Sequence, residues 1–205
     1  MEIELKYAIP DEATERVLWN NELFADVEEE GSREELHLNA KYFDTEDGDL
    51  ANNEIAYRVR EEGERYVAAM KWKGRSEDGL HVREEINVHV DDDTPNPEVF
   101  RESSVGEDVL DLLQGKELKC VLESRILRKK FRIDTGKGIF EISIDSGEVI
   151  TEAGTAPINE IEIELFSGET EELMEVGRRI QERYNLKPEN ISKYARGMEL
   201  IKRHK

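Results

Sequence analysis

Two acidic patterns stand near opposite ends of the 205-residue sequence. In both, charged residues alternate with apolar ones, in the stretches MEIELKYAI and INEIEIEL. Neighbouring side chains of a β-strand point to opposite faces, so each pattern predicts a strand whose charges share one face. The charges of the first stretch are Glu2, Glu4 and Lys6, and those of the second are Glu160, Glu162 and Glu164. Clustered carboxylates bind hard cations such as Mg²⁺ or Mn²⁺ through oxygen.

Basic residues recur with the same period of two between the acidic patterns. Four further predicted strands carry them on one face: Arg58 and Arg60 in EIAYRVREE, Lys71 and Lys73 in RYVAAMKWKG, Arg83 in LHVREEINVHV, and Arg128 and Lys130 in ILRKKFRID. Guanidinium and ammonium groups bind phosphate oxygens. If these strands closed into a barrel with their charges inward, they would line a polar tunnel. Such a tunnel suits a polyanion, such as a chain of phosphates, held with a divalent metal.

A solvated sheet surface is the alternative interpretation of the same charges. Acids make up 49 of the 205 residues, so a single Glu-x-Glu pair arises easily by chance. The run Glu160-x-Glu162-x-Glu164 is harder to explain in this way. Like charges on one face destabilise a sheet unless solvent or a counter-ion lies between them. The repeated basic pairs in an acidic chain also favour a binding site.

The elements that would position these residues follow from periodicity and turn signals. After the N-terminal strand, strands are predicted at 36–45, 54–62, 65–74, 80–90, 119–134, 138–145, 147–153 and 158–168. Helices are predicted from Asp11 towards Phe24, and at 107–115, 169–185 and 189–203. About eight strands with few helices predict an α+β fold, either an antiparallel sheet or a barrel, decorated by helices.

Composition narrows the class of protein. The formal net charge of −20 disfavours nucleic acid and anionic lipid as partners. A single cysteine, Cys120, excludes an internal disulfide framework and fits a reducing compartment. The first residues lack an apolar signal core, and no apolar run is long enough to span a membrane. We therefore expect a cytoplasmic protein without a membrane partner.

A series of motifs runs through the chain in a consistent order. The motifs are EIELK, YFDT, YRVR, AMKWKG, HVREEINV, ISIDSGEV, EIEIELFSG and SKYARG. Each is weak alone, but together they resemble the CYTH domain, the fold of triphosphate tunnel metalloenzymes. The resemblance covers nearly the whole chain. It implies an eight-stranded antiparallel closed β-barrel around a hydrophilic tunnel, in a single domain over residues 1–205.

The resemblance also implies a role for each site residue. Metal ligands would be Glu2, Glu4, Glu164 and, as the second choice on the last strand, Glu162. Phosphates would be bound by Lys6, Arg58, Arg60, Lys71, Arg83, Arg128 and Lys193, to which we add the same-face bases Lys73 and Lys130. Glu85 and Asp145 would orient the bases. The catalytic set would be Glu162, Glu160 and Lys6, and one glutamate of the 160–164 strand would accept the proton of the attacking water.

In overall look the chain is most similar to the bacterial inorganic triphosphatases of the family. This likeness predicts hydrolysis of the terminal phosphoanhydride of tripolyphosphate with Mg²⁺ or Mn²⁺, and some activity on nucleoside triphosphates. No aromatic cluster in the sequence suggests an adenine or thiamine pocket. The alternatives that stay open are a class IV adenylate cyclase, a thiamine triphosphatase and a non-catalytic polyphosphate-binding module. A homodimer also stays open.

Three histidines lie on or beside the predicted strands. His37, His81 and His89 lack the spacing of metal ligands, and we interpret them as structural residues.

Overall fold

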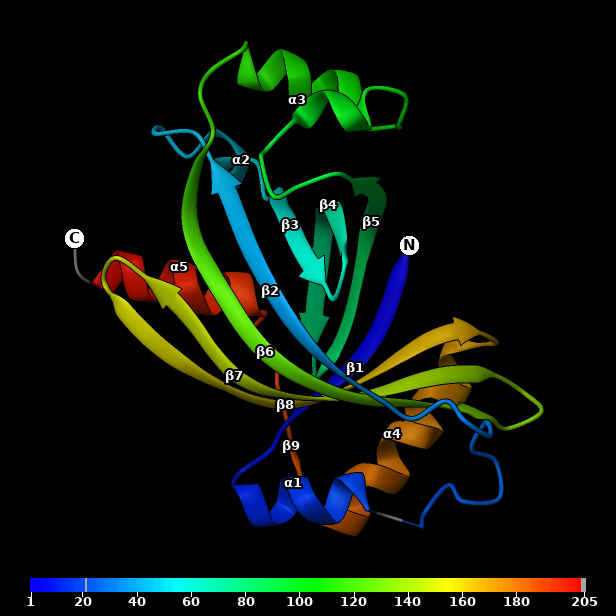
Figure 1. Ribbon diagram of the computed structural model, residues 1–205. Coiled ribbons are helices and arrows are strands. Elements are labelled where there is room, and N and C mark those ends of the chain that lie inside the picture. Colours follow the sequence, from blue (N-terminus) through cyan, green and yellow to red (C-terminus); the bar gives the residue numbers. More distant parts are fainter. Residues whose placement is uncertain (21, 204–205) are drawn as a thin grey trace.

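Eight long strands form a closed antiparallel barrel in the computed structural model, which describes residues 1–20 and 22–203 (Figure 1). The strands are β1 (Glu2–Ala8), β2 (Glu34–Asp44), β3 (Ala56–Glu62), β4 (Arg65–Glu77), β5 (Leu80–Val90), β6 (Lys119–Asp134), β7 (Ile139–Thr151) and β8 (Gly154–Ser167). Their order is β5-β4-β3-β2-β6-β7-β8-β1, and pairing of β1 with β5 closes the barrel. The predicted fold class, an α+β protein with an eight-stranded closed barrel, is confirmed.

Short helices surround the barrel. They are α1 (Glu12–Trp19), α2 (Asp49–Asn52), the 3₁₀ helix η1 (Pro97–Phe100), α3 (Gly106–Leu113), α4 (Thr170–Tyr184) and α5 (Lys193–Arg203). Figure 1 shows α1 and α4 below the curved strands β6–β8, and α3 at the opposite end near β3–β5. Helix α1 ends at Trp19, earlier than the sequence pattern predicted.

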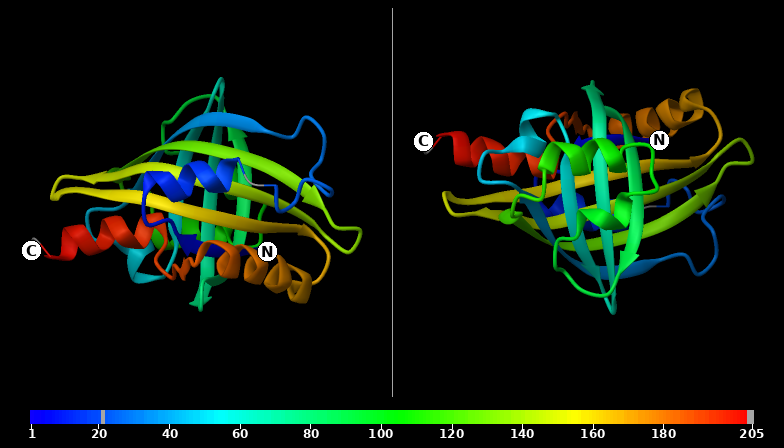
Figure 2. Two further views of the ribbon diagram at one scale, coloured as in Figure 1. Left: turned by 90° about the horizontal axis from the view of Figure 1, so that it is seen from below. Right: turned by 90° about the horizontal axis from the view of Figure 1, so that it is seen from above.

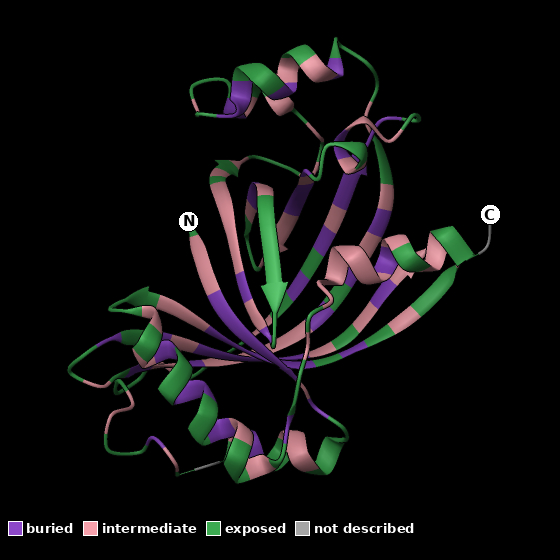
Figure 3. Ribbon diagram, turned by 180° about the vertical axis from the view of Figure 1, so that it is seen from behind, coloured by how far each residue is buried: buried purple, intermediate pink, exposed green. Residues whose placement is uncertain are grey.

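The outer face of the barrel below β6–β8 is apolar. Leu5 and Tyr7 of β1 point outward and are buried, together with Ile161 and Ile163 of β8. Helix α4 covers this face so closely that a Cβ at Gly177 would lie 2.3 Å from Leu5 Cδ1. The alternation seen in MEIELKYAI therefore places the apolar residues outside, under helices, and the charged ones inside. Figure 3 shows buried residues both on α4 and on the strands beside it.

A second apolar cluster covers the outer face of β3–β5. Tyr57, Val59 and Met70 pack there against Phe100 of η1 and Val109 of α3. The predicted helix at 107–115 thus forms as α3 and shields this side of the barrel. Figure 2 shows α3 lying across the strands when the molecule is viewed from above.

The C-terminal helix α5 closes the barrel interior on a third side. A two-residue strand, β9 (Lys187–Pro188), pairs with β1 and leads the chain to α5. Tyr194 and Met198 of α5 then pack against an apolar cluster on the inner faces of β2 and β6–β8. Gly197 lies so close to this cluster that a Cβ would come within 2.6 Å of Leu122 Cδ2.

One strand assignment from the sequence was wrong. The segments 138–145 and 147–153 form a single strand, β7, which pairs with β6 without a break from Glu123 to Asp134. Gly147 lies inside this strand and looks like a turn residue in the sequence. A Cβ there would lie 2.0 Å from Arg125 O, so glycine marks a close backbone approach instead.

Among the described residues, no helix combines the length and the apolar character that a membrane crossing requires. The single-domain boundary at 1–205 stays a prediction.

Candidate active site

A cavity of about 400 Å³ lies inside the barrel and is lined by charged side chains. Most of the predicted site residues line it, namely Glu2, Glu4, Lys6, Arg58, Arg60, Lys71, Arg83, Glu85, Arg128, Asp145, Glu162, Glu164 and Lys193. They come from seven strands and from the first residue of α5. The charged faces of the strands therefore point into the barrel, as in the tunnel hypothesis, and not to open solvent.

The first carboxylate cluster consists of Glu2, Glu4 and Glu164. Strand pairing brings Glu4 directly opposite Glu164 across β1 and β8. Burial, followed by the nearby charges of Glu2 and Glu4, raises the pKa of Glu164 to about 8. Within residues 1–20 and 22–203, Glu164 forms no ion pair. Glu164 is therefore the one carboxylate of this cluster that no base of the described residues neutralises.

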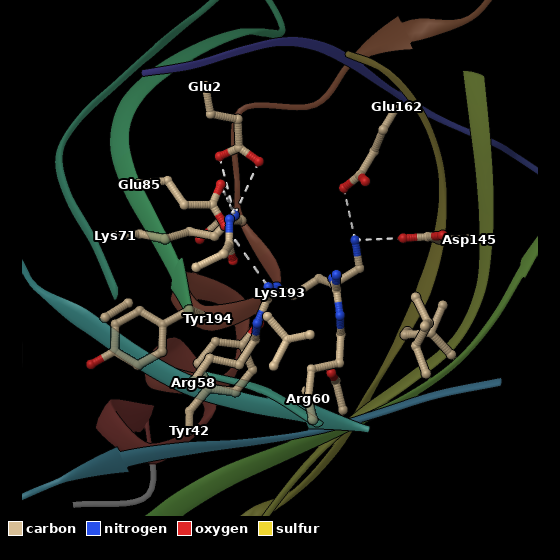
Figure 4. Close-up of a pocket in the computed structure, with 18 of the residues that line it drawn as sticks. Glu2, Tyr42, Arg58, Arg60, Lys71, Glu85, Asp145, Glu162, Lys193 and Tyr194 are labelled. Carbon is tan, nitrogen blue, oxygen red and sulfur yellow. Dashed lines mark hydrogen bonds and ion pairs between the residues drawn. The ribbon is translucent and has the colours of Figure 1, made fainter. Parts of the chain in front are cut away.

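Two bases compensate the other members of the first cluster. Lys71 Nζ lies 3.0 Å from Glu2 Oε1, and Arg83 Nε donates to Glu2 Oε2 at 2.5 Å. Arg83 also donates from Nη2 to Glu4 Oε1 at 2.6 Å. Burial alone would raise the pKa of Glu2, but Lys71 and Arg83 outweigh it and lower that pKa. Glu85 holds Lys71 from the other side at 3.1 Å (Figure 4).

The second carboxylate cluster consists of Asp145, Glu160 and Glu162. One oxygen from each of these buried acids lies within 4.8 Å of the others, a spacing at which a metal ion could be held. Cations of the protein occupy this position, however. Lys193 Nζ lies 2.8 Å from Asp145, 2.5 Å from Glu160 and 2.8 Å from Glu162. Figure 4 shows Lys193 extending across the cavity towards Glu162 and Asp145.

Two more bases complete the neutralisation of the second cluster. Arg128 forms a bidentate pair with Asp145 at 2.7 and 2.6 Å and also reaches Glu162 at 2.5 Å. Lys6 Nζ lies 3.0 Å from Glu162 and 3.5 Å from Glu160. Burial alone would raise the pKa of Glu162, but Lys193, Lys6 and Arg128 lower it well below its usual range. Three acids thus face three bases, and Glu162 stays an anion.

The bases on β3 are less well compensated. Arg58 is buried, and its Nε has no hydrogen-bond partner in the described part of the chain. Arg60 donates from Nε to Glu62 at 2.6 Å. Burial, with Arg58 and Arg128 nearby, lowers the pKa of Arg60. This part of the cavity therefore carries positive charge that an anion would stabilise.

Lys73 was predicted to share the cavity face with Lys71, and this prediction is wrong. Strand β4 contains a bulge, because Trp72 pairs with Glu84 and Arg75 with Val82, leaving two residues opposite Arg83. Lys73 is exposed with a φ of 53°, and Gly74 takes the inward place, where a Cβ would lie 3.9 Å from that of Arg83.

Two other predicted residues also lie outside the cavity lining. Lys130 pairs with Glu141 at 3.2 Å and with Glu34 at 3.9 Å, farther along β6 than Arg128. Glu160 is buried and forms ion pairs with Lys6 and Lys193. Its Oε2 has no hydrogen-bond partner among the described residues. The roles assigned to Lys130 and Glu160 stay predictions.

The sequence interpretation missed an aromatic wall of the cavity. Tyr42 of β2 and Tyr194 of α5 stack with ring centroids 5.5 Å apart, and both line the cavity beside Arg58 (Figure 4). Leu38 and Ile126 continue this wall as apolar residues. The two tyrosines are 152 positions apart in the sequence, so no local pattern could reveal the pair.

The first cluster fits a hard divalent cation better than the second does. All ligand atoms in both clusters are carboxylate oxygens, which suit Mg²⁺ or Mn²⁺. A cation at the second cluster would have to displace three bases that already pair with its acids. At the first cluster it would offset both the burial and the repulsion that raise the pKa of Glu164. The observed charges therefore agree with Glu2, Glu4 and Glu164 as the predicted metal ligands.

The family model of the CYTH domain matches residues 1–198 of this chain. Among curated proteins, an inorganic triphosphatase of Haemophilus influenzae is 27% identical over 175 residues, which cover 85% of this chain and 47% of the relative. The chain thus spans about half the length of that relative.

Solved structures share the fold. A Hippeastrum protein, described as an adenylyl cyclase candidate with a dominant triphosphatase activity, superposes with a TM-score of 0.75 at 20% identity, covering 97% of this chain and 96% of that one. A protein of Pyrococcus horikoshii superposes with a TM-score of 0.57 at 22% identity, covering 97% and 99%. At these identities the likeness concerns the fold.

Proposed function

The chain belongs to the CYTH domain family, and we propose that it is a metal-dependent triphosphatase that hydrolyses the terminal phosphoanhydride of inorganic tripolyphosphate. The observation that carries this proposal is the collection of bases inside the barrel of a chain with a net charge of −20. Arg58 is buried, lies no closer than 4.0 Å to the carboxylate of Glu85 and has an Nε without a hydrogen-bond partner among the described residues, so a bound anion would stabilise it. The likeness to an inorganic triphosphatase supports phosphate chains as that anion.

In this proposal the bases divide the work of binding. Arg58 and Arg60 on β3 bind the end of the phosphate chain that lies beside the tyrosine wall. Lys71 and Arg83 bind the phosphates next to the first cluster, where they already lie within 3.1 Å of carboxylates. Phosphoryl transfer depends mainly on such positioning and on charge stabilisation.

Glu2, Glu4 and Glu164 would hold the divalent cation. When bound, Mg²⁺ or Mn²⁺ supplies a Lewis acid that neutralises phosphate charge and lowers the pKa of a water. The protein keeps the basic side chain beside this site in its charged form. Lys6 is buried, which alone would lower its pKa, but Glu162, Glu4 and Glu160 raise that pKa, so Lys6 remains a cation beside the reacting phosphate.

The strong lowering of the pKa of Glu162 changes the role we assign to it. A carboxylate that resists protonation is a poor proton acceptor near neutral pH. We therefore assign Glu162 to holding Lys6 and Lys193 in place, as their distances of 3.0 and 2.8 Å suit. Glu160 supports the same two bases from behind.

Nucleoside triphosphates are a second substrate class that one observation favours. The Tyr42–Tyr194 pair offers an aromatic surface at the end of the cavity where Arg58 lies. A planar base could stack there while its phosphates reach Lys71 and Arg83. This arrangement supports slower hydrolysis of ATP beside that of tripolyphosphate. Cyclic AMP formation and thiamine triphosphate hydrolysis are outcomes of the same assay.

Purified protein is incubated with tripolyphosphate, ATP or thiamine triphosphate, with Mg²⁺ or Mn²⁺, and the products are identified. We expect orthophosphate and pyrophosphate from tripolyphosphate at the highest rate. Lys71→Ala should raise KM roughly tenfold, because it removes a phosphate contact. Lys73→Ala is the matched control and should leave KM unchanged, because Lys73 points away from the cavity. Tight binding of tripolyphosphate without any turnover would instead identify a polyphosphate-binding module.

A further inference from the structure

The segment 189–192 leads the chain to Lys193, which lies in the cavity, and it belongs to no helix or strand. It follows β9, whose two residues pair with Tyr7 and Ala8 of β1, and it ends where α5 begins. Lys193 then reaches Asp145, Glu160 and Glu162. The direction in which Lys193 points therefore depends on what holds this short segment.

The turn between β4 and β5 holds the segment through the backbone. Gly79 N–H donates to Asn190 Oδ1 at 2.7 Å, and Gly79 O accepts from Lys6 N–H at 2.8 Å. Glu189 N–H in turn donates to Lys6 O at 2.9 Å. Gly79 has a φ of 81°, and a Cβ there would lie 2.6 Å from Lys6 O, so only glycine permits this approach.

His81 adds a side-chain hydrogen bond to the same segment. It is buried, and its Nε2 lies 2.8 Å from Glu189 O while its Nδ1 lies 2.7 Å from Ser76 Oγ. A carbonyl oxygen can only accept, so Nε2 carries the proton. Burial, with Lys6 nearby, lowers the pKa of His81, so Nδ1 is free to accept from the Ser76 hydroxyl. The imidazole thus joins β4 to the segment in one orientation.

Glu189 connects these hydrogen bonds to the start of α5. Its side chain accepts from Ile191 N–H at 2.8 Å and from Arg196 Nη2 at 2.8 Å. The residue is therefore held through its backbone by His81 and Lys6, and through its carboxylate by the first turns of the helix that carries Lys193.

We propose that His81 and Asn190 form a latch that positions Lys193 in the cavity, with His81 acting as a positioning residue. His81 touches no substrate in this proposal, and its effect on phosphate binding runs through Lys193. The proposal rests on the proposed function for its effect on tripolyphosphate, but the latch itself concerns only the fold of residues 189–193. Loss of the latch should let α5 start in more than one direction and separate Lys193 from the second cluster.

Hydrogen–deuterium exchange tests the latch without any substrate. His81→Ala and Asn190→Ala should speed exchange at the amides of Glu189 and Ile191 at least about tenfold, as expected for loss of about 1.4 kcal/mol of local protection. His81→Gln should restore slow exchange, because its amide nitrogen can replace Nε2. Unchanged exchange in both alanine variants would overturn the latch. Asn190 is exposed, so its variant keeps the test decisive if His81→Ala does not fold.

A second experiment tests whether His81 acts through Lys193. Binding of tripolyphosphate is measured by calorimetry in a buffer that contains Ca²⁺, and turnover is measured separately. His81→Ala should weaken binding roughly tenfold in the wild-type chain but have little further effect in the Lys193→Ala background. Equal weakening in both backgrounds would overturn the positioning role. If wild-type protein neither binds nor hydrolyses tripolyphosphate, the proposed function fails, while the exchange result still decides the latch.

Discussion

Two clusters of three carboxylates lie inside one barrel, yet their electrostatics differ. The second cluster, Asp145, Glu160 and Glu162, is compact and contains as many bases as acids, so the pKa of Glu162 is lowered. In the first cluster burial and its neighbours raise the pKa of Glu164 to about 8. The cluster that looks more like a metal site by distance alone is thus the one already neutralised. The proposed metal site is therefore chosen by the balance of charge around the carboxylates and not by the spacing of their oxygens alone.

The largest effect is expected from the first cluster on turnover. Glu4→Gln should lower kcat/KM for tripolyphosphate by roughly a hundredfold or more, because loss of a metal ligand removes several kcal/mol of charge stabilisation. Circular dichroism should show an intact fold. Glu35→Gln, an exposed residue of β2, is the matched control and should retain full activity. Full activity of Glu4→Gln would show that hydrolysis does not need this carboxylate of the first cluster, and would contradict the contrast between the clusters.

The second cluster should matter most for stability. Glu162→Gln leaves Lys6, Lys193 and Arg128 with one buried anion fewer. Removing one partner of a buried ion pair costs about 3–5 kcal/mol, and we expect a loss of that order in the free energy of unfolding measured with urea. Glu164→Gln should be neutral or stabilising, because it removes a crowded charge. Equal destabilisation by both variants would contradict the contrast.

The pH dependence of stability should carry the signature of Glu164. Its pKa of about 8 in the folded protein lies above the unfolded value, so between these values the folded state binds more protons than the unfolded state. The free energy of unfolding should therefore fall as pH rises from 6.5 to 8, with a slope of at most about 1.4 kcal/mol per pH unit. His81 contributes with the opposite sign at the lower end of this window, because its pKa is lowered in the folded protein while its unfolded imidazole, with a pKa of about 6.5, still binds protons there.

Glu164→Gln tests the origin of that slope. In chelator-treated protein the variant should show a flatter dependence over pH 6.5–8, measured by urea unfolding at each pH. A slope as steep as that of the wild type would assign it to another group.

The smallest effect concerns the metal itself. Saturating Mn²⁺ without substrate should raise Tm by a few degrees, because a ligand that binds only the folded state stabilises it. Glu164→Gln should lose most of this rise, and Asp145→Asn should keep it. The reverse pattern would move the metal to the second cluster.

Much of the cavity was predictable because strand periodicity is local. The alternation around Lys6, Arg58 and Arg128 assigned each to one face, and the barrel turned those faces inward. The same rule failed at Lys73, because a bulge adds one residue and shifts the alternation. The sequence also predicted two strands where β7 is continuous, because Gly147, a glycine required by close strand packing, looks like a turn residue.

The amino-acid order sets which side chains are charged, which faces they share and that the apolar faces need helices as cover. The pairing of particular acids with particular bases depends on how the strands and α5 meet in space. Lys193 enters the barrel from a helix at the far end of the chain, neutralises the second cluster and leaves the first short of a cation. A pKa depends on burial and on charges within a few ångströms. Lys193 lies 31 to 48 positions from its three acids in the chain, so it supplies its charge to them only after folding.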